Sequence, residues 1–509
     1  MKNNFFTKNI ILLITTFLLL LNTMPLQNAI FLDKNIAQPN ENLQNSSNCQ
    51  ITNNNIITVD DDGDENYTSI QEAIDAASEG DTIQVYSGLY KENIILNKQL
   101  TLIGVEENGE GIPIIDAESG EYAVCIESDK CYFEGFNITN SSKNDIYYAG
   151  IILFSDKNII KNNIILDNIC GIWQKNSNNN IFSKNNLSNN NIGILMVESS
   201  NNIIIDNNIN CTRVTMDLPY CYGIYVWYHC DNNTISNNSI SCDFNGGGIM
   251  ISESKNNKII NNIINSFSTL NSTSIPFKYG ANAILLIQES HNTKIIANDI
   301  SDYLIAIQIW NSNKNLLSKN NIVNNGLYGL YLYISHFNNI KNNNFIDNSK
   351  LWDEELNRIP DGLFKWFFMR LVKQQATFAD SFFNNWNRNY WDDWSKILTK
   401  SIRGFISIRK MTKIIIDDKQ HGIPHIPVRK YDWFPLKEPY ENNQEGTSFL
   451  TFSNEPKSNN LFNLINNLNN NYNQKVNLPK INIFDEKTRS KTNFYLPPFN
   501  LTPFLGENL

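Results

Sequence analysis

The sequence predicts an all-β fold, a parallel β-helix that stacks coils of about 22 to 24 residues on one another. Units sharing the pattern x-I-x-x-N-N-x-I, a polar turn and G-I-x-L/I-x occur at 159–180, 181–202, 234–257, 294–315 and 316–339. Apolar and polar residues alternate within each unit, which is typical of short strands. A single unit cannot bury its aliphatic side, so the coils must stack and pair their strands with neighbouring coils.

Composition fits one large repeat domain and limits the partners. The chain has 509 residues, of which 41% are hydrophobic, enough to bury a sizeable core. Its formal charge is -10, and it contains no basic run of the kind that a phosphate backbone requires. We therefore expect no nucleic-acid partner.

The N-terminal segment predicts export. Lys2 and Lys8 precede a continuous apolar run, and this pattern is typical of a secretory signal over residues 1–29, with cleavage expected near Ala29. A retained anchor is the alternative interpretation. A linker is expected at 30–55, and the mature chain is predicted to be secreted, extracellular or on the cell surface, or periplasmic in a double-membraned host, without a transmembrane domain.

A short helix is predicted over 69–79, ahead of the repeats. Ser69 and Glu72 form a capping box, apolar residues follow at helical spacing, and Gly80 can end the helix. The open end of a β-helix exposes core side chains and strand edges. We therefore expect this helix to cap the first coil.

Asparagine is expected at the sharp corners between strands. It tolerates the left-handed backbone region, and identical amides one coil apart can form a hydrogen-bonded ladder. The predicted ladder column is Asn163, Asn186, Asn208, Asn238, Asn262 and Asn321. Two coils carry longer excursions, at 211–221 and 265–280, which should project from one edge.

Cysteines are grouped in the middle of the chain. None of the eight forms a CxxC pair, which argues against a zinc or thioredoxin-like site. Cys211, Cys221, Cys230 and Cys242 are close enough in sequence to staple one loop, in a pairing that the sequence does not decide. Small buried thiols are an equal alternative.

Three segments resemble known β-helix proteins. The stretch YTSIQEAIDAASEGDTIQVYSGLYKENIILNKQLTLIG, with Gly88, Tyr90, Glu92 and Asn93, resembles the N-terminal cap of pectin-lyase-like right-handed β-helix proteins. The repeats resemble the NosD-like, carbohydrate-binding-and-sugar-hydrolase type. The segments NNWNRNYWDDW and KYDWFPLKEPY resemble its closing coils, expected over 377–440.

The resemblance implies a right-handed parallel β-helix over 56–440. The family includes polysaccharide lyases, esterases, depolymerase-like hydrolases and NosD itself, a periplasmic protein associated with copper-site maturation. One fold hosts many functions, so the resemblance alone does not choose among them. A NosD-like periplasmic role in copper-centre maturation is kept as the second alternative function, after polysaccharide hydrolysis.

The G-I-x-L/I-x strand has two outward columns that are unusually apolar for a solvated face. Aromatic rings with polar edges suit the faces of sugars, and contiguous apolar surface marks an interaction site or a covered surface. The predicted ligand-binding residues are Trp173, Tyr225, Trp227, Trp310, Tyr331 and Tyr333. The expected ligand is a polysaccharide or a partner protein, and the alternative is a later segment that covers the face.

Such a segment is present in a predicted helical insertion at 349–376. Its stretch 363–374 has one apolar helical stripe flanked by Lys and Arg. A stripe of this kind needs an apolar surface to pack on. Docking on the β-helix is favoured over contact with a membrane surface.

Glu253 and Glu289 are the predicted catalytic pair if the protein is an enzyme. They follow the same strand in successive coils, where two carboxyl groups can approach the separation used by retaining glycoside hydrolases, about 5 Å. The competing interpretation is two solvated acids at a strand end. The enzyme hypothesis is therefore secondary, and its reaction would be polysaccharide hydrolysis.

No cofactor is predicted. Asp60, Asp62 and Asp64 resemble the start of a calcium loop, but Glu65 and Gln71 replace its glycine and its bidentate glutamate. His421 and His425 lie close in sequence, but the intervening Pro424 argues against a helical copper pair. Copper and calcium thus have no support in the sequence. The final segment, 441–509, is Asn-rich without periodicity and is predicted to be disordered.

Overall fold

The computed structural model describes most of the predicted β-helix. The described residues are 55–63, 65–212, 221–243, 246–267, 280–349, 375–394, 399–407 and 425–440. The predicted signal segment, the helical stripe at 363–374, the tail at 441–509 and His421 lie outside these ranges.

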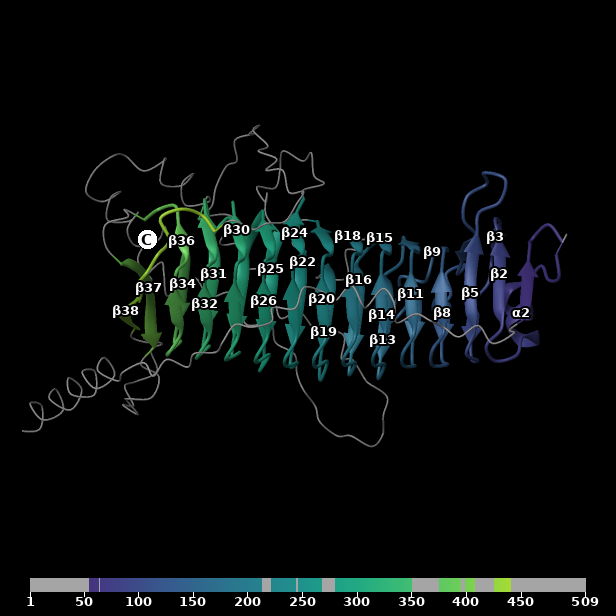
Figure 1. Ribbon diagram of the computed structural model, residues 1–509, viewed down its shortest axis with the longest axis horizontal. Coiled ribbons are helices and arrows are strands. Elements are labelled where there is room, and N and C mark those ends of the chain that lie inside the picture. Colours follow the sequence, from purple (N-terminus) through teal and green to yellow (C-terminus); the bar gives the residue numbers. More distant parts are fainter. Residues whose placement is uncertain are drawn as a thin grey trace, which may run out of the picture. The chain divides into compact units, whose positions relative to one another are not determined.

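Three stacked sheets form the unit that spans residues 54–509 (Figure 1). Each coil of the repeats contributes one strand to each sheet, and all strand pairs are parallel except β37 and β38, which are antiparallel at the end of sheet C. Sheet A contains β1 (Ile56–Val59), β2 (Thr82–Tyr86), β5 (Thr101–Val105), β8 (Tyr132–Glu134), β11 (Ile159–Lys161), β14 (Ile181–Ser183), β17 (Ile203–Ile205), β20 (Thr234–Ser236), β23 (Lys258–Ile260), β26 (Lys294–Ile296), β29 (Leu316–Ser318), β32 (Asn339–Lys341) and β35 (Asn385–Asn387). Sheet B contains β3 (Leu89–Tyr90), β6 (Ile114–Asp116), β9 (Asn137–Thr139), β12 (Ile164–Leu166), β15 (Asn186–Asn190), β18 (Asn208–Cys211), β21 (Ser239–Cys242), β24 (Ile263–Ser266), β27 (Asp299–Ser301), β30 (Asn321–Val323), β33 (Asn344–Ile346) and β36 (Tyr390–Trp391). Sheet C contains β4 (Ile94–Leu96), β7 (Tyr122–Ile126), β10 (Ala149–Leu153), β13 (Cys170–Lys175), β16 (Ile192–Val197), β19 (Tyr222–Trp227), β22 (Gly247–Ser252), β25 (Gly280–Ile287), β28 (Tyr303–Trp310), β31 (Tyr328–Tyr333), β34 (Ala376–Ala379), β37 (Lys400–Ser407) and β38 (His425–Asp432).

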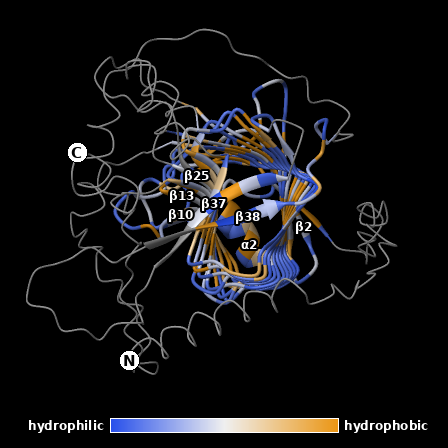
Figure 2. Cartoon of the chain, turned by 90° about the vertical axis from the view of Figure 1, so that its left-hand side faces the viewer, coloured by the Kyte–Doolittle hydropathy of each residue, from blue (hydrophilic) through white to orange (hydrophobic). Residues whose placement is uncertain are grey.

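Aliphatic columns fill the interior, and the predicted parallel β-helix is confirmed. In sheet A, Ile204 pairs with Phe182 in one neighbouring coil and with Ile235 in the other, and all three side chains are fully buried. Burial of each such side chain contributes roughly 1.5 to 3 kcal/mol. Figure 2 looks along the stack and shows hydrophilic turns gathered at one corner, with hydrophobic strands between the corners.

The glycine of the repeat is required by close backbone approach. A Cβ atom on Gly193 would lie 2.5 Å from the carbonyl oxygen of Gly223 in the next coil, and equally close to Ile209. Gly171 meets Gly193 in the same way, at 2.7 Å. A side chain at this position would push adjacent coils apart.

An interior amide ladder runs along the corner between sheets A and B. Each amide oxygen accepts the backbone N–H of the ladder residue one coil earlier: Asn185 donates to Asn207 at 2.9 Å, and Asn207 donates to Asn238 at 2.9 Å. The ladder is Asn163, Asn185, Asn207, Asn238, Asn262, Asn298, Asn320, Asn343 and Asn389. These side chains are buried, so the amides satisfy backbone groups that water cannot reach.

The predicted ladder column was wrong in three of its members. Asn163, Asn238 and Asn262 belong to the interior ladder, whereas Asn186, Asn208 and Asn321 are each one residue later, on sheet B strands outside the core. The ladder residue always precedes a buried side chain by two positions, as Asn207 precedes Ile209. That core residue sets the register, so the ladder uses the first asparagine of some pairs and the second of others.

The cap helix is α2 (Ile70–Ala76), held at both ends by residues of the first coil. The Glu92 carboxylate accepts the N–H groups of Ile70 and Gln71, each at 2.9 Å. The Lys98 ammonium donates to three carbonyl groups at the other end of the helix. The helix is shorter than the predicted 69–79, because Ala77 is already extended and the turn that leads into β2 begins there.

Three of the long connections between coils' strands lie at one corner, between sheets B and C. The two predicted excursions join a sheet B strand to a sheet C strand, β18 to β19 and β24 to β25, and the connection from β33 to β34 also lies at this corner. The connections from sheet A to sheet B are short, as between β11 and β12. The outer side of sheet C is therefore the side that borders the variable connections.

Candidate functional site

The outer side of sheet C carries the two predicted columns in register. We call it the sheet C face. Its first column is Trp173, Leu195, Tyr225, Met250, Leu285, Gln308 and Tyr331, and its second is Lys175, Val197, Trp227, Ser252, Ile287, Trp310 and Tyr333. The inward neighbours Ile224 and Val226 are fully buried. Alternation along β19 therefore sends its rings outward, as the sequence predicts.

Rings on the sheet C face contact one another within and between coils. Tyr225 and Trp227 lie 6.1 Å apart with planes 17° from parallel, and Tyr331 and Tyr333 lie 6.4 Å apart at 23°. Trp310 contacts Tyr333 of the next coil at 6.0 Å. These contacts hold the rings in fixed orientations before any ligand arrives, which lowers the entropy cost of binding.

Burial along the face is uneven. Leu195 and Met250 are 1% and 3% exposed, and Trp227 is 8% exposed. The other predicted ligand-binding residues, Trp173, Tyr225, Trp310, Tyr331 and Tyr333, are half-buried. At the first coil of the repeats, Tyr147 lies against Trp173 with ring centroids 5.2 Å apart. These five half-buried aromatic side chains, without Trp227, are thus the accessible aromatic part of the face.

An acidic row borders this face at the turn after the strands. It consists of Glu198, His229, Glu253 and Glu289 in four successive coils. The residue that follows each of them is buried, and these residues are Ser199, Cys230, Ser254 and Ser290. All members of the row have left-handed backbone angles, φ between 49° and 65°. Ile334 adopts the same conformation at the equivalent turn, so the turn imposes it irrespective of the side chain.

Glu253 and Glu289 are on adjacent coils, and their environments differ. Burial raises the pKa of Glu253, His229 lowers it, and Glu289 raises it further, with a net rise. Glu253 is half-buried, whereas Glu289 is exposed. Glu253 therefore holds its proton more tightly, next to the solvated Glu289. Two carboxyl groups in such different environments can divide the roles of acid and nucleophile between them.

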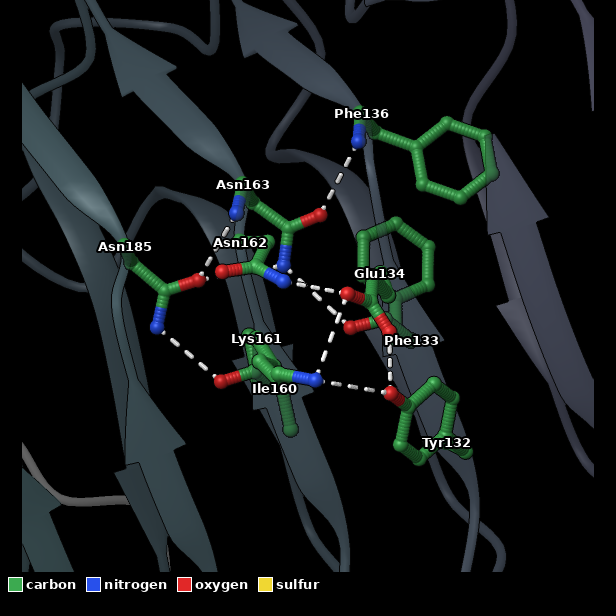
Figure 3. A network of polar contacts seen from close by, with 9 residues as sticks. All are labelled: Tyr132, Phe133, Glu134, Phe136, Ile160, Lys161, Asn162, Asn163 and Asn185. Atoms are coloured by element: carbon green, nitrogen blue, oxygen red, sulfur yellow. Dashed lines mark hydrogen bonds and ion pairs between the residues drawn. The ribbon is translucent and has the colours of Figure 1, made fainter. Parts of the chain in front are cut away.

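A second polar cluster lies on the outer side of sheet A, and the sequence reasoning missed it (Figure 3). The Glu134 carboxylate accepts hydrogen bonds from the Tyr132 hydroxyl and the Asn162 amide, and it pairs with Lys161 at 3.4 Å. Burial raises the pKa of Glu134, but the hydrogen bond from Tyr132 and the other polar partners outweigh burial and lower it. Glu134 is therefore a fully partnered anion, suited to joining coils rather than to proton transfer. Glu134 and Lys161 are register partners on β8 and β11, a signal that strand alignment could have found.

Two histidines have structural roles. Nδ1 of His291 accepts the N–H of Asn313 at 2.9 Å, and Nδ1 of His336 accepts the N–H of Phe382 at 3.0 Å. A ring nitrogen that accepts a hydrogen bond carries no proton, so both rings are neutral in this arrangement. Burial lowers the pKa of each ring.

In the described ranges, no group of three or more His, Cys, Asp or Glu side chains is placed so that it could hold a metal ion. Asp60 accepts the N–H of Asp62, and Asp61 accepts the N–H of Leu89, so these acids close a turn. Among the described residues, no helix is long and apolar enough to cross a membrane.

Two family models match the chain. Residues 74–280 match the family described as periplasmic copper-binding protein (NosD), and residues 223–354 match the right handed beta helix region. A cell surface glycoprotein of Methanothermus fervidus is 40% identical over 88 residues, which are 17% of this chain and 14% of that protein.

Several solved structures are similar at low identity. The complex of XylC with xylose has 13% identity and a TM-score of 0.41, covering 68% of this chain and 88% of that one. The catalytic unit of an alpha-1,3-glucanase from Streptomyces thermodiastaticus has 14% identity and a TM-score of 0.41, covering 55% and 60%. DFA-IIIase from Arthrobacter chlorophenolicus without its lid has 12% identity and a TM-score of 0.46, covering 66% and 94%. Because these scores are low, the assignment rests on the family models and on the sheets. The matched segments and the three stacked sheets identify the chain as a right-handed parallel β-helix protein.

Proposed function

We propose that the protein is an exported β-helix, at the cell surface or otherwise outside the cytoplasm, that binds glycan through the sheet C face. The surface location is supported by the name of the Methanothermus relative and by the periplasmic description of the NosD family. Glycan binding is supported by one observation above all. Half-buried aromatic side chains stand in register on the face that borders the long connections.

The physical basis is stacking. A sugar ring presents apolar C–H groups on its faces and hydroxyl groups at its edge, so it packs on an aromatic face while polar neighbours bind its hydroxyls. Trp310 and Tyr333 come from adjacent coils and contact each other at 6.0 Å, which makes a surface longer than one ring. The row that contains Glu253 and Glu289 borders this surface and supplies hydrogen-bond acceptors.

The test measures binding of the full chain to a panel of polysaccharides by pull-down and then by calorimetry. Trp310→Ala and Tyr333→Ala should each weaken binding about ten-fold or more, equivalent to roughly 1.4 kcal/mol. Trp433→Ala is the matched control, because Trp433 is 64% exposed and lies outside the face. Absence of binding to the whole panel, or an equal loss in the control, would refute the proposal.

Polysaccharide hydrolysis by Glu253 and Glu289 is the second candidate function. It is favoured by their position on adjacent coils and by the raised pKa of Glu253. In this mechanism Glu253 donates a proton to the leaving oxygen, and the Glu289 carboxylate attacks the anomeric carbon.

Release of reducing ends from the same polysaccharide panel tests the hydrolase candidate. Glu253→Gln and Glu289→Gln should each abolish release, while Glu198→Gln, at the equivalent turn further down the row, should retain it. If the wild-type protein releases no reducing ends from a polysaccharide that it binds, it is a binding protein and not a hydrolase.

A further inference from the structure

A second amide ladder follows the corner between sheets B and C, and cysteines interrupt it. Asn190 accepts the N–H of Asn168 at 3.0 Å, as in the first ladder. In the next coil the register partner of Asn190 is Cys211, and in the coil after that it is Cys242. The amides resume later, where Asn325 donates to Asn348. A thiol therefore replaces the amide in the coil of β18 and β19, which carries an excursion, and again in the next coil, whereas Ser266 takes this position in the coil of β24 and β25.

The physical reason is the connection at this corner. An amide ladder closes a tight turn, but the coil of β18 and β19 has a long connection there and no tight turn to close. Cys211 ends β18 on one side of this connection, and Cys221 immediately precedes β19 on the other. The two cysteines thus stand at the two ends of one connection, within a single coil.

Three thiols meet in the interior at this point. Cys211, Cys221 and Cys242 are at most 2% exposed, and the Cys211 thiol is within hydrogen-bonding reach of the other two. Cys230 does not join them. It lies at another corner of the coil, where its sulfur accepts the N–H of Ser199 at 3.2 Å. The predicted group of four is therefore a group of three.

Geometry within the group distinguishes one pair. The Cys242 thiol donates to the carbonyl oxygen of Gly247 at 3.0 Å and also lies within reach of the other two thiols, but it belongs to the next coil, so a bond to it would join two coils. Cys211 and Cys221 belong to the same coil, at the two ends of one connection. A bond between them would stay within one coil and would leave the spacing between coils unchanged.

We propose that Cys211 and Cys221 form a disulfide that closes the base of the connection between β18 and β19. Both S–H bonds break and one S–S bond forms. The two electrons and the two protons pass to the disulfide of an exchange partner such as oxidised glutathione, which becomes two thiols. Because the folded thiols are buried, the exchange takes place during folding. In the cell the bond rests on the proposed export, since disulfides persist in oxidising compartments.

The bond would fix the two ends of the connection, one of which leads directly into β19 of the sheet C face. A disulfide restricts the freedom of the segment that it closes, here the residues between Cys211 and Cys221. Tyr222 and Tyr225 follow directly on β19, with ring centroids 5.5 Å apart. The cross-link would therefore anchor the connection where it meets the aromatic side chains.

The test refolds the denatured, reduced full chain with glutathione in its reduced and oxidised forms, or with reductant alone. Alkylation under denaturing conditions followed by mass spectrometry counts the thiols. We expect two fewer alkylated thiols after refolding with oxidised glutathione. Trypsin cleaves after Arg213, between the two cysteines. A peptide containing Cys211 should therefore be joined to the peptide containing Cys221.

Cysteine variants test whether the cross-link joins Cys211 to Cys221 or to another thiol. Cys242→Ser and the isolated-thiol control Cys170→Ser should keep the cross-link, whereas Cys221→Ser and Cys221→Ala should lose it. Circular dichroism of each variant verifies its strand content. The alanine variant is included because alanine, unlike serine, places no hydroxyl group in the interior that needs a hydrogen bond. Full alkylation of the wild-type protein, or a cross-link that persists in both Cys221 variants, would overturn the proposal. Because the oxidant is supplied in vitro, this result is independent of export and of glycan binding.

Discussion

The carboxylate of Asp432 accepts hydrogen bonds from both the backbone N–H and the side-chain amide of Asn389, at 2.9 and 3.0 Å. Asn389 is the last asparagine of the interior ladder, and Asp432 is fully buried on β38. Every ladder asparagine directs donors toward the next coil. The last coil therefore needs an acceptor without donors, and a carboxylate meets this need.

Asp432→Ala should destabilise the protein by roughly 3 kcal/mol, because the buried donors on Asn389 and on the Trp391 indole, 3.2 Å from the carboxylate, lose their acceptor. Urea unfolding followed by circular dichroism measures the change. Glu106→Ala, at an exposed position, is the control and should change the unfolding free energy by less than about 0.5 kcal/mol. Equal effects of the two substitutions would contradict the role of Asp432 as the ladder terminus.

Asn207 and Asn208 form a matched pair for the ladder itself. Asn207 is 2% exposed, and its amide nitrogen donates to Asn238 and to two carbonyl groups, whereas Asn208 is exposed. Asn207→Ala should cost roughly 2 to 3 kcal/mol of unfolding free energy, and Asn208→Ala less than about 0.5 kcal/mol. Thermal and urea unfolding of the two variants distinguish the interior ladder from the predicted column. A larger loss for Asn208→Ala would reverse this assignment.

A third amide ladder follows the corner between sheets C and A, and its asparagines include Asn158, Asn180, Asn202, Asn233, Asn257, Asn315 and Asn338. Thr293 interrupts this ladder, and its replacement by asparagine should stabilise the protein. The side-chain nitrogens of Asn257 and Asn315 and the Thr293 hydroxyl are buried without a hydrogen-bond partner in the described part of the chain. Elsewhere in this ladder the amides connect, as where Asn233 accepts the N–H of Asn202 at 2.7 Å. Thr293→Asn should raise the unfolding free energy by about 1 kcal/mol and increase the melting temperature.

Thr234→Asn, at a partly exposed position on β20, is the control and should leave the melting temperature nearly unchanged. A lower melting temperature for Thr293→Asn would indicate that the gap already holds a water molecule that the larger side chain displaces.

Acidification should lower the free energy of unfolding through protonation of His291 and His336. The pKa of each is lowered from 6.5 in the folded protein, by burial first, so the unfolded chain binds protons more readily. Their contribution to stability is complete above the unfolded pKa and is lost as pH falls through the lower folded pKa. The unfolding free energy should therefore be level near pH 8 and should fall below about pH 6.5.

The double variant His291→Asn, His336→Asn tests this dependence. Asparagine at equivalent turns also accepts the next N–H, as Asn313 accepts that of His336 at 2.6 Å, but it does not titrate. The variant should keep most of the stability near neutral pH and lose much of the slope between about pH 5 and 6.5. An unchanged slope would assign the acid sensitivity to other groups.

Strand registers were predictable because the alternation of residues is a local property. The pattern G-I-x-L/I-x places Tyr225 and Trp227 outside and Ile224 and Val226 inside, and each coil repeats this choice. Burial of one aliphatic column per sheet then forces every coil into the same register, since a slip by one residue would expose it.

Contacts between distant segments were not predictable in the same way. Asp432 meets Asn389 across 43 residues. No repeat marks this interaction, because it depends on where the final strand lies relative to the last coil of the ladder. The same holds for the separation of Cys230 from the other three thiols.

The sequence by itself determined the parallel β-helix, its capping helix and the outward aromatic columns, because these follow from periodicity and from the need to bury aliphatic side chains. Only the tertiary structure decided which asparagine of each pair enters the ladder, which thiols meet, and how deeply each outward ring is buried. Those outcomes depend on the stacking of one coil on the next. In this protein, stacking selects one of two adjacent and chemically identical residues, Asn207 over Asn208, for the interior.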